Sequence, residues 1–164
     1  MQNMKMTKDY GRKTIVIERW FAADIDRVWK AWTTASLLER WWGPKEWPAS
    51  SKSFAFCPGG HWHYYMTGPD GTQAWGWVDY ITIADRESFT AVDSFCDAAG
   101  VKNTQFPVTR WAVKFMSPAT DTVAMTVTLS FADEADMAKL VEMGFEAGFS
   151  SALCNLEELL SADA

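Results

Sequence analysis

Apolar and polar residues alternate most regularly in the segment 122–131. Every second residue there is apolar, and the residues between them are polar or small. Because successive side chains of a strand point to opposite faces, this period of two predicts a half-buried antiparallel strand. The apolar set is Val123, Met125, Val127, Leu129 and Phe131.

Six other segments predict strands, since they combine β-branched or aromatic residues with turn residues at their ends. The sequences PGG at 58–60 and GPDG at 68–71 are typical of tight turns between strands. Strands joined by short turns pair with antiparallel neighbours, so we expect an antiparallel sheet of about seven strands. The six further strands are expected at residues 13–22, 54–57, 61–67, 72–84, 87–96 and 108–116.

Two short helices are predicted directly after the first of these strands. Asp24 can cap a helix in which Ile25, Val28, Trp29 and Trp32 recur at helical spacing. A second helix follows and ends before the Gly-Pro pair at 43–44, because these residues terminate helices. Its apolar residues are Leu37, Leu38, Trp41 and Trp42.

One long helix is predicted from Asp133 to about Leu160. Apolar residues recur along it at the spacing of a single face, which must be buried against the sheet. Gly144 and Gly148 lie on one line of this helix. Because each glycine costs about 1 kcal/mol relative to alanine inside a helix, the pair indicates close packing or open space beside the helix.

The order of elements predicts an α+β fold in which a curved antiparallel sheet surrounds a long C-terminal helix. The pattern contains no repeat and no linker, so residues 13–164 are expected to form a single domain. Residues 1–12 are polar and mixed in charge, and we expect them to form a flexible lead-in.

Composition and charge narrow the classes of partner. The net charge of −6 repels phosphate backbones and anionic lipids, which argues against nucleic acid and membrane surfaces as partners. No apolar run reaches the roughly 20 residues that cross a bilayer. The three cysteines, Cys57, Cys96 and Cys154, lie far apart, as expected for reduced thiols in a cytoplasmic protein.

Several motifs together resemble the activator of heat-shock-protein-90 ATPase homologue family. The matching segments include 21–33, WWGP at 41–44, PGG at 58–60 and GPDG at 68–71, and 142–149 near the end. That family belongs to the START-like (SRPBCC) superfamily, whose helix-grip fold is shared with the birch pollen allergen. Three positions depart from the family pattern: Ala55 and Cys57 replace an aspartate and an arginine that relatives often carry, and Asp24 replaces a helix-opening proline.

The resemblance implies a cavity between the sheet and the C-terminal helix, because START-like relatives have one. Aromatic and apolar residues would line it, since ten Trp and ten Phe exceed ordinary usage in 164 residues. The alternative is that these residues simply fill the core. The expected lining residues are Trp62, Tyr64, Met66, Trp111, Phe115, Met125, Phe145 and Phe149, with Trp42 near the entrance.

Arg19 shares a strand face with Ile15, Ile17 and Phe21. If that face points inward, the arginine is buried and needs a partner. It would then bind a ligand carboxylate or form a structural ion pair, or its head group would extend to the rim. Trp41 and Trp42 are adjacent and cannot both face the core from one short helix. One of them is then expected at an entrance or an interface, or the pair has a structural role in closing the end of the sheet.

The two histidines carry the remaining candidate chemistry. His61 and His63 share one strand face, an arrangement that can present two imidazoles to a metal, and Cys57 lies across the turn as a candidate nucleophile. Neither set is completed by a recognisable motif, so we predict no catalytic residue, no metal site and no cofactor.

The amino-acid sequence is compatible with three functions. The first is binding of a hydrophobic small molecule in the cavity. The second is a protein-interaction module, either a homodimer or a partner of a chaperone. The third is an enzyme of the cyclase or hydrolase kind, which needs polar groups with perturbed pKa values inside the cavity.

Overall fold

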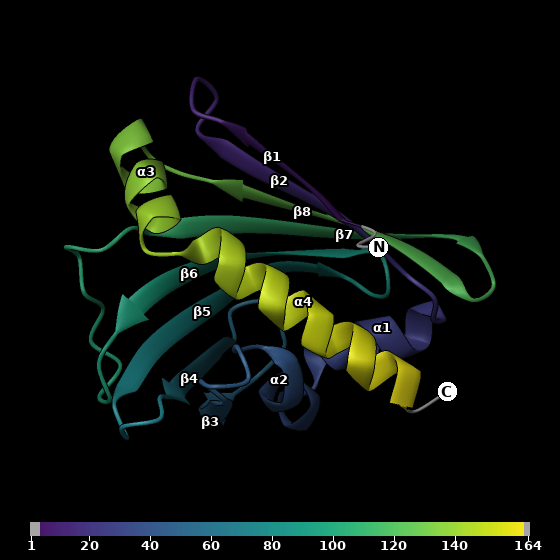
Figure 1. Cartoon of the computed structure of the whole chain (residues 1–164), viewed down its shortest axis with the longest axis horizontal. Helices are drawn as coiled ribbons and strands as arrows, with labels where there is room; N and C mark the ends of the chain where they lie inside the picture. The colour runs from purple at the N-terminus through teal and green to yellow at the C-terminus, as the bar shows by residue number, and fades with distance from the viewer. Residues whose placement is uncertain (1–3, 163–164) are drawn as a thin grey trace.

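Eight antiparallel strands form one sheet in the computed structural model, which describes residues 4–162 (Figure 1). The strands lie in the order β1-β2-β8-β7-β6-β5-β4-β3. Strands that follow one another in sequence are therefore neighbours in the sheet, except β2 and β3, because β2 pairs with β8 instead. Their bounds are β1 Met4–Asp9, β2 Thr14–Phe21, β3 Ala49–Phe54, β4 His61–Thr67, β5 Gln73–Ala84, β6 Ser88–Cys96, β7 Thr109–Ala119 and β8 Thr122–Ser130.

Two pairs of helices complete the described part of the chain. The short helices α1 (Ile25–Thr33) and α2 (Ala35–Trp41) follow β2, as predicted. The helices α3 (Glu134–Glu142) and α4 (Phe145–Ala162) end the chain, and α4 crosses one face of the sheet (Figure 1). This arrangement confirms the α+β class and the long C-terminal helix against a curved sheet.

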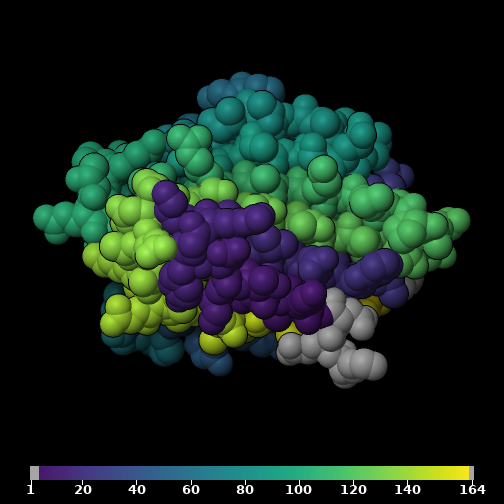
Figure 2. Space-filling view, turned by 90° about the horizontal axis from the view of Figure 1, so that it is seen from above, coloured from purple at the N-terminus to yellow at the C-terminus, as the bar shows by residue number. Residues whose placement is uncertain are grey.

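The N-terminal segment differs from the expected flexible lead-in, because Met4–Asp9 forms the edge strand β1. Met4 and Met6 are partly buried against the core, which gives this strand an apolar face. Lys8 also forms an ion pair with Glu146 of α4, with Nζ and Oε1 2.9 Å apart. Figure 2 shows the purple N-terminal segment packed beside the yellow-green C-terminal helices.

The strand β3 lies several residues earlier than predicted. The predicted segment was 54–57, whereas the structure pairs Ala49–Phe54 with β4 and leaves 55–60 to the turn. Three serines and a lysine hide this edge strand, since they lack the apolar alternation of a half-buried strand. The Ser51 amide donates to Glu39 of α2 at 2.7 Å, and the Trp62 indole N–H donates to the Ser51 hydroxyl at 2.9 Å, which together fix its place.

The predicted continuous helix from Asp133 to Leu160 is interrupted at Gly144. This residue has φ = +93°, in the left-handed region that favours glycine, and therefore ends α3 in the manner of a C-terminal glycine cap. The following residue, Phe145, begins α4. Gly148, by contrast, lies inside α4, and a Cβ at that position would meet no atom within 4 Å.

Replacement of the two glycines by alanine should therefore change the free energy of unfolding in opposite directions. We expect Gly144→Ala to lower the free energy of unfolding by about 1 to 2 kcal/mol, because the left-handed conformation strains an L side chain. We expect Gly148→Ala to raise it by about 0.5 to 1 kcal/mol, because alanine favours a helix interior and finds open space. Urea unfolding of both variants measures these free energies, and equal changes in the two variants would contradict the helix break at Gly144.

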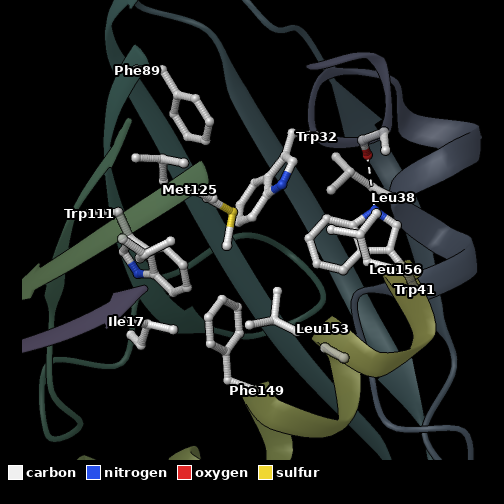
Figure 3. Close-up of a cluster of buried hydrophobic side chains, with 14 of the residues drawn as sticks. Ile17, Trp32, Leu38, Trp41, Phe89, Trp111, Met125, Phe149, Leu153 and Leu156 are labelled. Carbon is white, nitrogen blue, oxygen red and sulfur yellow. Dashed lines mark hydrogen bonds between the residues drawn. The ribbon is translucent and has the colours of Figure 1, made fainter. Parts of the chain in front are cut away.

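An aromatic core packs between the sheet and the helices. Trp32 of α1, Trp111 of β7 and Phe149 of α4 are all buried and point toward one another around Met125 (Figure 3). Trp41 is fully buried, and its indole N–H donates to the Ala31 carbonyl at 3.0 Å. The core therefore joins both short helices to α4 and to the centre of the sheet.

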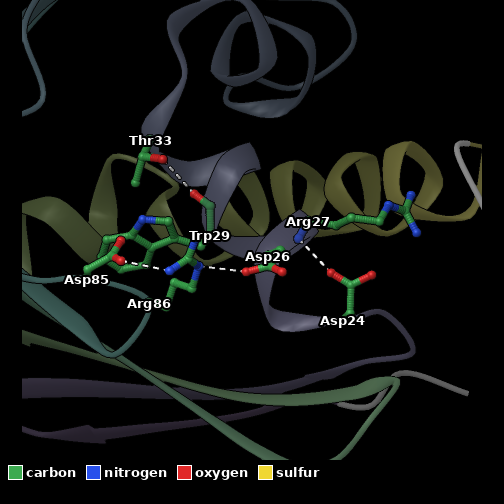
Figure 4. A network of polar contacts seen from close by, with 7 residues as sticks. All are labelled: Asp24, Asp26, Arg27, Trp29, Thr33, Asp85 and Arg86. Atoms are coloured by element: carbon green, nitrogen blue, oxygen red, sulfur yellow. Dashed lines mark hydrogen bonds and ion pairs between the residues drawn. The ribbon is translucent and has the colours of Figure 1, made fainter.

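Polar contacts hold α1 against the turn between β5 and β6 (Figure 4). The Asp24 carboxylate caps α1 by accepting from the Arg27 amide at 2.8 Å. Arg86, in the turn, pairs with Asp26 of α1 at 2.6 Å and with Asp85 at 2.8 Å. These side chains are exposed, so the pairs position α1 more than they stabilise the fold.

Candidate functional site

A pocket of about 530 Å³ lies between the inner face of the sheet and helices α3 and α4. The size falls in the range of small-molecule sites. Most of its walls are aromatic or apolar, and it opens beside the loop that follows β6. Its lining residues include Trp42, Pro44, Tyr64, Met66, Trp75, Gly76, Asp93, Phe95, Cys96, Phe106, Trp111, Leu140, Phe145, Gly148 and Phe149.

Two glycines make room for this pocket. A Cβ at Gly76 would lie 2.5 Å from the Tyr64 ring, so the absence of a side chain lets that ring lie flat across β5. Gly148 leaves open space beside α4 at the opposite wall. The sequence pattern indicated either close packing or open space beside the helix, and the position of Gly148 agrees with open space.

The structure brings six of the ten proposed ligand residues to the pocket. Trp62 lines a small void next to it, of about 20 Å³, which is the size of about one water molecule. Phe115 and Met125 are buried in the core, and neither contributes to the pocket wall. The six at the pocket are Trp42, Tyr64, Met66, Trp111, Phe145 and Phe149.

Arg19 lies away from the pocket, at the other end of α4. It is only 3% exposed, and its guanidinium pairs with Glu157 at 3.2 Å and donates to the Trp20 carbonyl at 2.8 Å. The guanidinium also lies over the Phe21 ring, 4.9 Å from its centroid. Of the roles expected for this arginine, the structural ion pair matches its position.

The adjacent tryptophans divide their roles as their spacing predicts. Trp41 points into the core, whereas Trp42 is partly exposed and lines both the pocket and the small void. The Trp42 ring contacts Trp62, Tyr64, Trp111 and Phe149, with ring centroids between 5.5 and 6.3 Å away. The Trp42 side chain, at the end of α2, therefore contacts β4, β7 and α4 and forms part of the pocket wall.

Asp93 is the charged group that the sequence analysis did not single out. It lies on β6, opposite Val78 of β5 and Thr109 of β7, and lines both the pocket and the void. Burial raises the pKa of its carboxyl to about 7, and only the backbone amide of Ser94 acts in the opposite direction. Among residues 4–162, no side-chain donor or cation reaches this carboxylate within hydrogen-bond distance.

The groups around Asp93 stay neutral near pH 7. Burial raises the pKa of Tyr64 well above its usual value, with a smaller contribution from the Asp93 charge, and the pKa of Tyr80 rises for the same two reasons. Burial also raises the pKa of the Cys96 thiol to about 11. Asp93 is therefore the group in this wall that changes charge near neutral pH.

Two indole N–H groups near Asp93 also lack partners within the described part of the chain. They belong to Trp32 and Trp111, both buried and both lining the small void. Trp111 also lines the pocket. The wall thus combines a carboxylate with a free hydrogen-bond donor in otherwise apolar surroundings.

A signal for Asp93 is present in the sequence. Phe89, Ala91, Asp93 and Phe95 occupy alternate positions of one strand, so they share a face. Three apolar members predict that the face points inward, and the fourth is then a carboxylate in the interior. This application of the period-two rule would have identified the residue.

The histidines lie on the outer face of the sheet. The His61 ring stacks on Trp77 at 4.2 Å and forms a hydrogen bond with the Ser53 hydroxyl, and the His63 ring nitrogen lies 3.1 Å from the Asp97 carbonyl. Residues 4–162 contain no group of three His, Cys, Asp or Glu side chains arranged to hold a metal. Cys57 is exposed.

The sheet that curves around a long C-terminal helix defines the chain as a helix-grip protein. The model of the Activator of Hsp90 ATPase homolog 1-like protein family matches residues 22–161, and the chain belongs to this family. No curated protein matches the chain. None of the helices in the described segment is long and apolar enough to cross a membrane.

Solved structures agree with this assignment. A protein from Arthrobacter aurescens is 38% identical with a TM-score of 0.91, over 96% of this chain and 91% of that one. Protein Ms6760 from Mycobacterium smegmatis is 29% identical with a TM-score of 0.87, over 95% of both chains. The AHSA1 protein from Silicibacter pomeroyi shares the fold, with 15% identity and a TM-score of 0.72 over 92% of this chain and 99% of that one.

Proposed function

We propose that this protein binds a hydrophobic small molecule in the pocket between the sheet and α4. The observation that carries the proposal is the 530 Å³ pocket itself, walled mainly by aromatic and apolar side chains. Pockets of this size bury most of the surface of a small ligand, and burial of apolar surface supplies the affinity.

Filling the pocket tests this proposal directly. Gly148→Leu places a four-carbon side chain into the open space at the pocket wall, so we expect binding of 1-decanol to weaken by about tenfold or more. Ala147→Leu is the matched control, because it adds a similar side chain to an exposed position of the same helix. Isothermal titration calorimetry measures both, and equal weakening or none would count against the pocket as the site.

Native mass spectrometry of protein purified without detergent gives an independent check. A non-covalent mass of a few hundred daltons that disappears from Gly148→Leu but persists in Ala147→Leu is the expected result. The pair of variants also separates a specific ligand from a host-derived contaminant on the surface.

The protein-interaction alternative has weaker support. Trp20 and Met116 are 49% and 66% exposed and lie on either side of Ala124 on the outer face of the sheet. A stable interface buries about 800 Å² on each partner, which is far more than these side chains provide. A homodimer or a chaperone complex would therefore need polar surface as well.

Asp93 favours acid–base catalysis as a second candidate function. A carboxyl with a pKa near 7 in an apolar pocket is suited to exchange a proton with a bound molecule. Mass analysis of a bound compound before and after incubation distinguishes the two functions, since a carrier returns it unchanged.

A further inference from the structure

No side chain in the described part of the chain pairs with the Asp93 carboxylate, and the backbone amide of Ser94 is the one group that favours its charge. Desolvating a charged group without compensation is costly, and proteins normally pair such a group or keep it neutral. Since Asp93 retains partial exposure and lines the pocket, a bound molecule can reach it. The missing partner is therefore a group that a ligand can supply.

Aromatic rings surround the same place. Trp42 and Trp111 line the pocket with Asp93, and their ring centroids lie 5.7 Å apart. Tyr64 contributes a third ring, 6.2 Å from that of Trp42. At these distances the rings pack against one another, so they form one aromatic wall of the pocket. The faces of such rings attract cations, including quaternary ammonium groups.

We propose that the pocket selects an apolar molecule that carries an ammonium group, with this cation against Asp93 and the rings of Trp42, Tyr64 and Trp111. The inference rests on the proposed function, because it assigns a ligand class to the same pocket. The aliphatic or aromatic body of the ligand then lies along α4, against Phe145 and Phe149.

The charge of the pocket argues against ligands that carry an anionic group. None of the residues that line it is lysine or arginine, and the chain carries a net charge of −6. A fatty-acid carboxylate would therefore meet Asp93 without a compensating cation. A neutral ligand supplies no cation for Asp93, although a hydroxyl group can donate a hydrogen bond to it.

The charge state of Asp93 sets the pH dependence. The facing titratable groups are Tyr64 on β4, Tyr80 on β5 and Cys96 on β6, all of which stay neutral between pH 5.5 and 8.5 because burial raises their pKa values. Asp97 lies at the rim, where its carboxylate accepts from the Ala99 and Val101 amides. The residues from α2, α3, α4 and β7 that line the pocket carry no charge.

Three probes of equal chain length test the inference. Decyltrimethylammonium is a permanent cation, 1-decanol is neutral, and decanoate is an anion. Titration calorimetry below their micelle concentrations, with the indole N–H resonances of Trp42 and Trp111 as reporters, measures affinity and place together. We expect decyltrimethylammonium to bind at least about tenfold more tightly than either of the others.

Asp93→Asn should remove most of that preference and leave the affinity for 1-decanol within about twofold. Asp121→Asn is the control, since it removes the same charge from an exposed turn of the described chain. In the unmodified protein, decyltrimethylammonium should bind about tenfold more tightly at pH 8.5 than at pH 5.5, because Asp93 ionises between them.

The outcomes separate the two proposals. Tight binding of 1-decanol that equals binding of the cation overturns the cation preference but leaves the hydrophobic pocket in place. Preference for decanoate overturns it as well. Failure of all three probes to shift the pocket resonances overturns the proposed function together with this inference.

Discussion

Replacing Asp93 by asparagine is expected to raise the free energy of unfolding by about 2 to 4 kcal/mol at pH 8. The carboxyl has a pKa of about 7 in the folded protein, against the ordinary aspartate value of 3.8. Each pKa unit of difference between the folded and unfolded states corresponds to about 1.4 kcal/mol. Folding therefore opposes ionisation of this group, and asparagine removes that cost.

The sign of this effect fixes its pH dependence. A carboxyl whose pKa rises on folding costs nothing below its unfolded pKa, and its cost grows as the pH rises toward the folded value of about 7. The stability gained by Asp93→Asn should therefore be largest above pH 7 and vanish near pH 4. Urea unfolding at pH 4, 6 and 8 measures it.

Asp121→Asn serves as the control, because that side chain is exposed and its removal leaves the desolvated carboxyl in place. It should show no comparable gain. A gain for Asp93→Asn that is the same at pH 4 and pH 8 would show that ionisation is not its cause. The expected result also means that the protein retains a destabilising group in its pocket, as binding sites commonly do.

Gly43→Ala is expected to lower the free energy of unfolding by about 3 kcal/mol. Gly43 is buried directly after Trp42, and a Cβ there would overlap the Trp47 carbonyl oxygen and lie 3.0 Å from Met66 Sδ. The Gly43 carbonyl also accepts from the buried Asn155 side chain of α4 at 2.9 Å. Relief of the overlap requires the backbone between α2 and β3 to move.

Thermal unfolding followed by circular dichroism measures this loss, with Gly148→Ala as the control for an added methyl group in open space. Gly43 directly follows Trp42, which lines the pocket. A shift of the Trp42 indole resonance should therefore accompany the lower melting temperature. Unchanged stability would mean that the loop adapts without cost.

Several features could be predicted from the sequence because local periodicity alone produces them. The alternation at 122–131 corresponds to β8, and the capped apolar repeat at 25–33 corresponds to α1. The inward faces of β4 and β7, with Trp62, Tyr64 and Trp111 buried, follow from the same rule. These patterns repeat along one element, so they need no knowledge of its neighbours.

Other features depend on contacts between distant segments. β1 forms because Thr14–Phe21 offers a free edge and the core accepts Met4 and Met6. The polar segment Ala49–Phe54 becomes a strand because Tyr64 and its neighbours on β4 pair with it. Neither outcome is visible in the local pattern, since propensity is weak where tertiary pairing decides.

The family, the helix-grip order of elements and the inward position of most aromatic residues could all be predicted from the amino-acid sequence. Which of those residues surround open space depends on the packing between α4 and the sheet, which separates the pocket residue Phe149 from the core residues Phe115 and Met125. The same packing leaves Asp93 in that space without a side-chain partner among the described residues. The physical reason is that burial and charge pairing are properties of three-dimensional neighbours, whereas periodicity is a property of the chain.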